Sequence, residues 1–149
     1  ILMSATADPQ PPHRFEVHVT SDSHFGWIRT RLSVERTMMS WVRTSVSLIG
    51  FGFTIVQFFE RLGAMDHVAH AARPQAPRYL GLALIASGIG ALVISIWQYR
   101  WILDYLWSPD FKPIAGVKRA PIETPLLGTA VVLILIGLFA FFAVLTRAV

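Results

Sequence analysis

The sequence predicts an all-α membrane protein with three transmembrane helices, with the N-terminus cytoplasmic and the C-terminus outside. Hydrophobic residues make up 54% of the 149 positions and charged residues only 15%, whereas charged residues make up about 25% of a typical soluble chain. Two windows, 79–99 and 124–146, contain no Asp, Glu, Lys, Arg or His. A helix needs about 20 apolar residues to cross a hydrocarbon core of roughly 30 Å, so both windows are long enough.

The first span is expected at about 40–60, and it is the least apolar of the three. Residues 44–59 carry no ionisable side chain, but this window alone is too short to cross a bilayer. A full crossing that ends before Glu60 must therefore begin near Ser40. Arg43 is then predicted to lie just inside the membrane boundary.

The second and third spans are expected at about 79–100 and 125–146. Pro77 precedes the second span and Pro125 opens the third, and proline is well tolerated in the first turn of a helix. The third span carries no charged residue, so we expect it to face lipid. Aromatic residues crowd the end of the second span, as they do where helices leave a membrane. They are Trp97, Tyr99, Trp101, Tyr105 and Trp107.

Basic residues mark the expected orientation, because positively charged loops remain on the cytoplasmic side. Most of them fall on the side of the N-terminus, namely Arg14, Arg29, Arg31, Arg36, Arg43, Arg100, Lys112, Lys118 and Arg119. The opposite side holds Arg61, Arg73, Arg78 and Arg147. We therefore expect the N-terminus inside, a flexible cytoplasmic segment over 1–25 and one three-helix transmembrane domain over 26–149.

Composition excludes several classes of function. The chain has no cysteine, which excludes disulfides, thiolate zinc sites and a cysteine nucleophile. It contains no phosphate-binding loop and no nucleophile-elbow motif, so we expect no enzyme and no cofactor. His67 and His70 follow Asp66 but lack a fourth ligand, and we expect a solvated loop there rather than a metal site. The cytoplasmic ends of the spans account for the net charge of +4, so no nucleic-acid partner is expected.

The most informative motif is an Arg-Thr pair that recurs every seven residues before and within the first span. Seven residues are close to two helical turns, so successive pairs lie about 10.5 Å apart on a stripe that drifts by only about 20°. If one helix runs through all the pairs, its arginines form a ladder from the cytosol into the hydrocarbon. This arginine ladder consists of Arg29, Arg36 and Arg43.

The chemistry of the ladder favours phosphate. Guanidinium groups remain charged and match phosphate oxygens bidentately. Hydroxyl groups beside the ladder are placed to complete the contacts to an oxyanion. These hydroxyls belong to Thr37, Ser40 and Thr44.

Simpler interpretations of the same charges remain open. Arg29 and Arg31 fit the ordinary positive-inside signal, in which arginines bind lipid phosphates at the membrane surface. Arg43 either reaches that surface in the same way or faces a protein interior or a wet cavity. Glu35 either pairs with Arg31, four residues earlier, or lies across a helix or subunit interface, where it limits how much anion the arginines attract.

The second span carries two further patterns. Arg100 and Asp104, four residues apart at its end, form either a surface pair or part of the arginine cluster. Gly81, Gly88 and Ser95 form a stripe of small residues at seven-residue spacing. Such a stripe lets another helix approach closely, either within one protomer or at an oligomer interface.

Residues 34–44, Val-Glu-Arg-Thr-Met-Met-Ser-Trp-Val-Arg-Thr, resemble the signature E-R-T-x-[LM]-[AS]-W-x-R-T of the YidH-like bacterial inner-membrane proteins, a domain of unknown function. The same domain forms the membrane part of the eukaryotic vacuolar transporter chaperone. The resemblance extends over about 26–147. It includes Gly50 and Gly52 in the first span, the Tyr99-Arg100 end of the second and the Pro125-Leu126 entry to the third.

In the eukaryotic relatives this domain assembles into a ring, and its basic first helices line a path for polyphosphate made by an attached polymerase domain. The resemblance therefore implies that Glu35, Arg36 and Arg43 are the functional polar residues, that Arg100 lies nearby and that the protein is in a bacterial inner membrane. No polymerase domain is present here, so we do not expect this chain to make polyphosphate.

Together, these patterns predict a homo-oligomer with its first helices turned inward, which contacts membrane lipids and binds or conducts phosphate-bearing anions such as polyphosphate. The expected anion-binding residues are Arg29, Arg36, Arg43 and Arg100. The expected supporting polar residues are Glu35, Thr37, Ser40, Thr44 and Asp104. The alternative is a non-transporting scaffold or regulatory subunit whose arginines dock anionic lipid headgroups or a protein partner.

Overall fold

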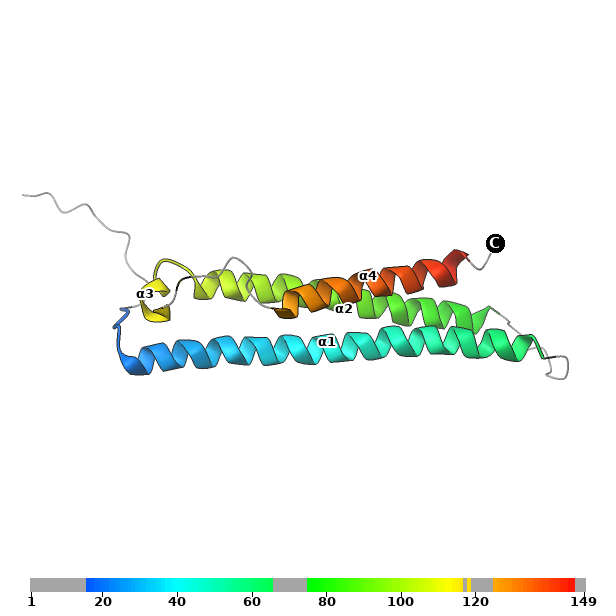
Figure 1. Cartoon of the computed structure of the whole chain (residues 1–149), viewed down its shortest axis with the longest axis horizontal. Coiled ribbons are helices and arrows are strands. Elements are labelled where there is room, and N and C mark those ends of the chain that lie inside the picture. The colour runs from blue at the N-terminus through cyan, green and yellow to red at the C-terminus, as the bar shows by residue number, and fades with distance from the viewer. Residues whose placement is uncertain (1–15, 66–74, 117, 119–124, 147–149) are drawn as a thin grey trace, which may run out of the picture.

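A computed structural model describes residues 16–65, 75–116, 118 and 125–146, and in these residues it is helical with no strand. The helices are α1 (Ser21–Gly63), α2 (Ala76–Leu106), α3 (Lys112–Ala115) and α4 (Pro125–Thr146). Figure 1 shows α1 and α2 side by side over most of their length, α4 alongside them, and short α3 near the end where α1 begins. Three of the helices are long and apolar enough to cross a membrane, which confirms the predicted fold class. The direction of crossing stays a prediction.

Helix α1 is much longer than the first expected span. Its 43 residues correspond to about 64 Å, twice the thickness of a hydrocarbon core. A capping box starts it: the Thr20 side chain accepts from the Ser23 backbone N–H at 3.2 Å, and the Ser23 side chain accepts from the Thr20 N–H at 2.9 Å. Residues 21–25, placed by the sequence in a flexible segment, are therefore helical, while residues 1–15 lie outside the described part of the chain.

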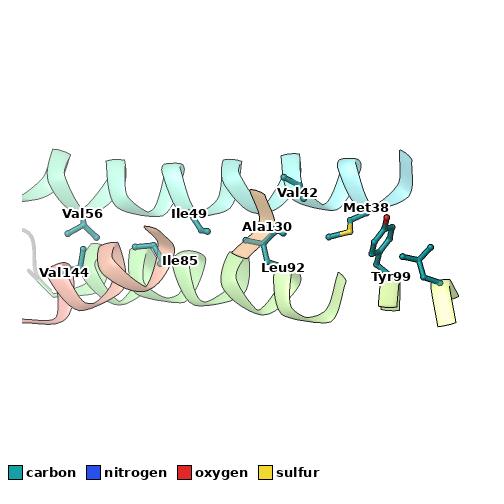
Figure 2. Close-up of a cluster of buried hydrophobic side chains, with 10 residues drawn as sticks. Met38, Val42, Ile49, Val56, Ile85, Leu92, Tyr99, Ala130 and Val144 are labelled. Atoms are coloured by element: carbon teal, nitrogen blue, oxygen red, sulfur yellow. The ribbon is translucent and has the colours of Figure 1, made fainter. Parts of the chain in front are cut away.

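The contact between α1 and α2 follows a heptad pattern, in which buried residues alternate at steps of three and four. Figure 2 shows the larger members of this core pointing toward one another from the two helices. On α1 this pattern comprises the buried residues Met38, Val42, Ser45, Ile49, Gly52 and Val56, and Trp27 is buried nearer the start of the helix. On α2 they are Gly81, Ile85, Gly88, Leu92, Ser95, Tyr99, Leu103 and Leu106.

Small residues bring the two backbones into contact. A Cβ atom added to Gly52 would lie 2.7 Å from the Gly81 carbonyl oxygen, and one added to Gly88 would lie 2.9 Å from the Ser45 carbonyl oxygen. Gly52 thus faces Gly81, and Ser45 faces Gly88. Of the two roles considered for the small-residue stripe of α2, the structure therefore shows packing within the protomer. Close backbone approach is the main source of helix association in lipid, where no hydrophobic effect acts between helices.

Helix α4 packs on the pair through a single stripe of small and branched residues, Ala130, Gly137 and Val144. A Cβ atom on Gly137 would lie 2.9 Å from Ile89 Cγ1 and 3.0 Å from Ile49 Cδ1, so α4 meets both other helices near its middle. At its end, Arg78 Nη2 donates to the carbonyl oxygens of Val144 at 3.0 Å and Leu145 at 2.9 Å. These bonds satisfy carbonyls that have no partner within α4.

A second, smaller core closes the opposite end of the bundle, which we call the α3 end. Its buried members are Trp27, Leu106, Ile114 and Ala115. The Trp27 indole N–H donates to the Leu106 carbonyl at 3.0 Å, and His24 Nδ1 lies 2.8 Å from the Ile114 carbonyl oxygen, to which it donates. The start of α1 is thereby fixed against both α2 and α3.

The backbone contact can be tested with two glycines of α2. Gly88→Leu is expected to destabilise the protein by about 1–3 kcal/mol, because the new side chain meets Ile49 and the Ser45 backbone. Gly90→Leu is the matched control, since a Cβ atom there meets nothing within 4 Å. Thermal unfolding in detergent, followed by tryptophan fluorescence, measures both. Equal midpoints for the two variants would contradict the close contact.

Candidate functional site

The arginine ladder lies on the side of α1 that faces away from α2. Arg36 and Arg43 each come two positions before an α2-facing residue, Met38 and Ser45. Two residues rotate an α-helix by about 200°, and Arg43 also follows the buried Val42 by one residue, or about 100°, so the ladder points away from the α2 contact without being directly opposite it. Arg29 lies seven residues earlier on the same stripe, and all three ladder arginines are exposed in the protomer. One continuous helix therefore holds the whole ladder.

The ladder belongs to a longer polar stripe that continues through the membrane-spanning part of α1. Its members alternate at steps of four and three, like the buried face of the same helix, and all are polar or glycine. We define the polar stripe as Arg29, Ser33, Arg36, Ser40, Arg43, Ser47, Gly50, Thr54 and Gln57. Our sequence interpretation missed Thr54 and Gln57, although the heptad spacing that revealed the ladder also reaches them.

Hydroxyl groups next to the ladder are already used by their own helix. The hydroxyl of Thr37 donates to the Ser33 carbonyl at 3.0 Å, that of Thr44 to the Ser40 carbonyl at 3.1 Å and that of Ser47 to the Arg43 carbonyl at 3.0 Å. In this arrangement their protons are not available to an anion. The guanidinium groups are thus the principal anion donors of the stripe, and the threonines would have to rotate to assist them.

Glu35 makes the local pair that its spacing suggests. Its carboxylate lies 3.5 Å from Arg31 Nε, with the two side chains 28% and 31% exposed. Arg31 also lies over the Trp27 ring, 5.9 Å from its centroid, on the side of the α3 end core. Glu35 nevertheless borders the ladder: it lines a shallow concavity of about 380 Å³ on α1 together with Leu32, Arg36, Met39, Ser40 and Arg43.

Arg100 and Asp104 are not brought to the ladder within one protomer. Both are exposed residues of α2, and Arg100 directly follows the buried Tyr99. Because α2 contacts the side of α1 that faces away from the ladder, α1 itself lies between these two residues and the ladder. The expected participation of Arg100 would therefore require another copy of the chain. Asp66, His67 and His70, the weak metal candidates, lie outside the described residues.

The packing of the helices places Arg43 deeper in the membrane than the sequence of the first span predicts. Gly88 is near the middle of the uncharged window of α2 and faces Ser45, while Gly137 is near the middle of α4 and lies against Ile49. Helices in contact share one lipid slab, so the middle of the membrane falls between Ser45 and Ile49 on α1. Arg43 is then about 3–9 Å from the middle, or about 6–12 Å inside a 30 Å core.

At this depth Arg43 is exposed and has no hydrogen-bond or ion-pair partner for its guanidinium among the described residues. An ionisable side chain within a membrane span ordinarily faces protein or water. Arg36, about 10.5 Å closer to the α3 end, lies near the edge of the hydrocarbon core. The site is thus a series of guanidinium groups that leads from the membrane surface toward its middle.

Water at the stripe can be detected with single cysteines, because the chain has none of its own. Gly90 is two residues beyond Gly88, just as Arg43 is two residues before Ser45, so Arg43 and Gly90 lie at similar depth on different helices. In lipid vesicles, a charged methanethiosulfonate is expected to modify Arg43→Cys readily and Gly90→Cys about tenfold or more slowly, because only a hydrated thiol ionises. Equally slow modification at both positions would contradict a hydrated stripe.

The family profile described as "Domain of unknown function (DUF202)" matches residues 29–104. The match covers the arginine ladder and nearly all of the α1–α2 contact. Neither the curated proteins nor the solved structures contain a match to the chain. The matched domain is the one carried by the YidH-like proteins that the motif at 34–44 resembles, so that resemblance is confirmed. This multi-pass membrane protein therefore belongs to the DUF202 family.

Proposed function

We propose that this membrane protein binds and conducts phosphate-bearing anions as a homo-oligomer in which the polar stripes of several α1 helices surround one hydrated path. The observation that carries the proposal is the exposure of Arg43 on the protomer, at a position that helix packing puts about 6–12 Å inside a 30 Å core. Facing lipid, a single arginine near the centre of a helix costs about 2.5–3.5 kcal/mol on insertion scales. An oligomer with α1 innermost removes that cost, because α2 and α4 then separate the stripe from lipid.

The spacing of the ladder suits an extended anion. Steps of about 10.5 Å are too long for one phosphate group to bridge, but a chain of phosphates can contact successive guanidinium groups, and a single phosphate can move from one to the next. Beyond Arg43 the stripe continues with the neutral side chains Ser47, Thr54 and Gln57, and the exposed Arg61 follows at the same spacing near the far end of α1. A path of this kind attracts anions at its charged ends and holds them weakly between, so that they can leave again, as conduction requires.

The proposal includes an orientation and a location. The α3 end, with the ladder entrance, is assigned to the cytoplasm, because most basic residues fall on this side. A bacterial inner membrane is assigned from the resemblance to the YidH-like inner-membrane proteins. We assign no chemical step to the stripe, since guanidinium groups, hydroxyls and an amide bind and steer anions but include no nucleophile activated by a base.

A second candidate function is a membrane scaffold or regulatory subunit whose arginines dock anionic lipid headgroups or a protein partner. An aromatic face at the α3 end of α2 favours it: Trp97, Trp101 and Tyr105 are all exposed and lie four residues apart. Such residues anchor helices at the level of the headgroups. Arg100 lies among them and would contact lipid phosphates there.

Reconstituted vesicles distinguish the two functions. With inorganic phosphate or short polyphosphate as the permeating anion, Arg43→Ala is expected to lower the flux about tenfold or more, because a hydrogen bond to a charged group contributes about 1.5–3 kcal/mol. Lys112→Ala, which removes an exposed positive charge of α3 that is not a member of the stripe, is the control and should leave the flux within about twofold.

Near-zero flux through the unmodified protein would reject conduction. Retention of anionic lipid by that protein, and its loss on changing Arg29 and Arg100 to Ala, would then favour the scaffold.

A further inference from the structure

Two different flanks border the polar stripe on the surface of α1. One flank carries exposed apolar residues every seven positions, Leu32, Met39, Val46 and Phe53. The other carries Thr37, Thr44, Phe51 and Phe58 at the same spacing. Phe51 and Phe58 are 63% and 57% exposed, so the described helices leave most of both rings uncovered. The stripe therefore lies between an apolar flank and a flank with two projecting aromatic rings.

A groove lies where α4 meets α1, and its α1 lining includes Phe53 of the first flank together with Gly50 and Gln57 of the polar stripe. Its volume is about 440 Å³. It is lined by Ile49, Gly50, Phe53, Gln57, Ile136, Phe139, Ala140 and Ala143. Three of these residues are small, and a Cβ atom added to Gly50 would meet nothing within 4 Å. The groove therefore exists because these side chains are small, and another side chain can enter it.

We propose that Phe51 and Phe58 of a second copy of this chain occupy the groove between α1 and α4. The inference rests on the proposed function in one respect, because both require a homo-oligomer. The groove and the projecting rings are on different flanks of α1, so the contact is heterologous. Each copy gives its rings to one neighbour and receives the rings of another, and such a contact forms a ring of subunits when the rotation closes.

Membrane depth supports this pairing. Copies that are related by rotation about an axis normal to the membrane hold every residue at an unchanged depth. The rings and the groove must therefore lie at the same level of α1. They do: Phe51 and Phe58 bracket the α1 residues Phe53 and Gln57 that line the groove. The neighbouring rings then cover Gly50 and Gln57, and the same rotation turns the rest of the polar stripe, the ladder with Ser47 and Thr54, toward the axis.

Charge complementarity supports the contact at the α3 end. Glu35 directly precedes Arg36 and is therefore rotated by about 100° from it around the helix axis. The rotation is toward the flank that carries Leu32 and Met39. That flank is the one that receives the neighbouring copy. The carboxylate, 28% exposed in its pair with Arg31, then lies between the ladders of adjacent copies. One negative charge at each contact reduces the repulsion between the converging arginines.

Disulfide formation tests the contact directly, since the chain has no cysteine. In lipid vesicles under mild oxidation, the double variant Phe51→Cys/Ala140→Cys is expected to give a series of cross-linked bands above the dimer. Each single variant is expected to stay monomeric on a denaturing gel. Efficient cross-linking of Phe51→Cys alone would mean a two-fold contact of α1 with itself and would overturn the proposal. A double variant without cross-links would assign the groove to lipid chains and would also overturn it.

A volume change gives an independent check. Gly50→Leu, whose Cβ atom meets nothing within 4 Å and whose side chain takes up space in the groove, is expected to abolish the cross-linked bands when added to the double variant. Gly90→Leu is the matched control, because it is equally unhindered but lies on α2, and it should leave the bands intact. Bands that survive Gly50→Leu would overturn the proposal.

The same samples separate this inference from the proposed function. Cross-linked bands without anion flux would support the interface and reject conduction. Anion flux that depends on Arg43, in a double variant that forms no cross-links, would support conduction and reject this interface.

Discussion

The direct contact of the α1 and α2 backbones is the constraint on which the rest of the structure depends. Gly52 against Gly81 and Ser45 against Gly88 fix the rotation of each helix as well as its position along the other. Once α1 is fixed in this way, its arginines must project from the opposite side. The same contact also links the depth of α1 to the apolar window of α2. The exposure of Arg43 and its depth in the membrane therefore both follow from the contact between α1 and α2.

Helix α1 meets two opposed physical demands on its two sides. Toward α2 it presents small and apolar residues, which suit a neighbour in lipid. Away from α2 it presents hydroxyls, guanidinium groups and an amide. The hydroxyls of Ser47 and Thr54 donate to carbonyls of their own helix, at 3.0 and 2.8 Å, and so cost little in lipid. The guanidinium of Arg43 has no such bond among the described residues, and this difference separates residues that tolerate lipid from one that needs water, protein or a lipid phosphate.

Hydropathy was sufficient to predict the three spans and the fold class, because both depend on windows of sequence within single helices. The ladder was predictable for the same reason. Three other features depend on contacts between helices and could not be predicted from one helix alone. The depth of Arg43 depends on which part of α2 faces Ser45, the separation of Arg100 from the ladder depends on which side of α1 meets α2, and the groove at Gly50 depends on where α4 lies. The early start of α1 was missed because its capping box uses Ser23 in place of the more usual Glu or Gln.

The seven-residue period of α1 also limits how its length can change. Inserting one residue between Arg36 and Ser45 would rotate everything before it by about 100° and carry the ladder out of its stripe. Inserting seven in α1 would leave both faces of the helix nearly aligned, with a drift of only about 20°, but would move Trp27 about 10.5 Å along the axis from Leu106. Viable length variants among relatives should therefore differ by whole heptads in α1 and α2 together, so the number of arginines in the ladder changes with the length of both helices.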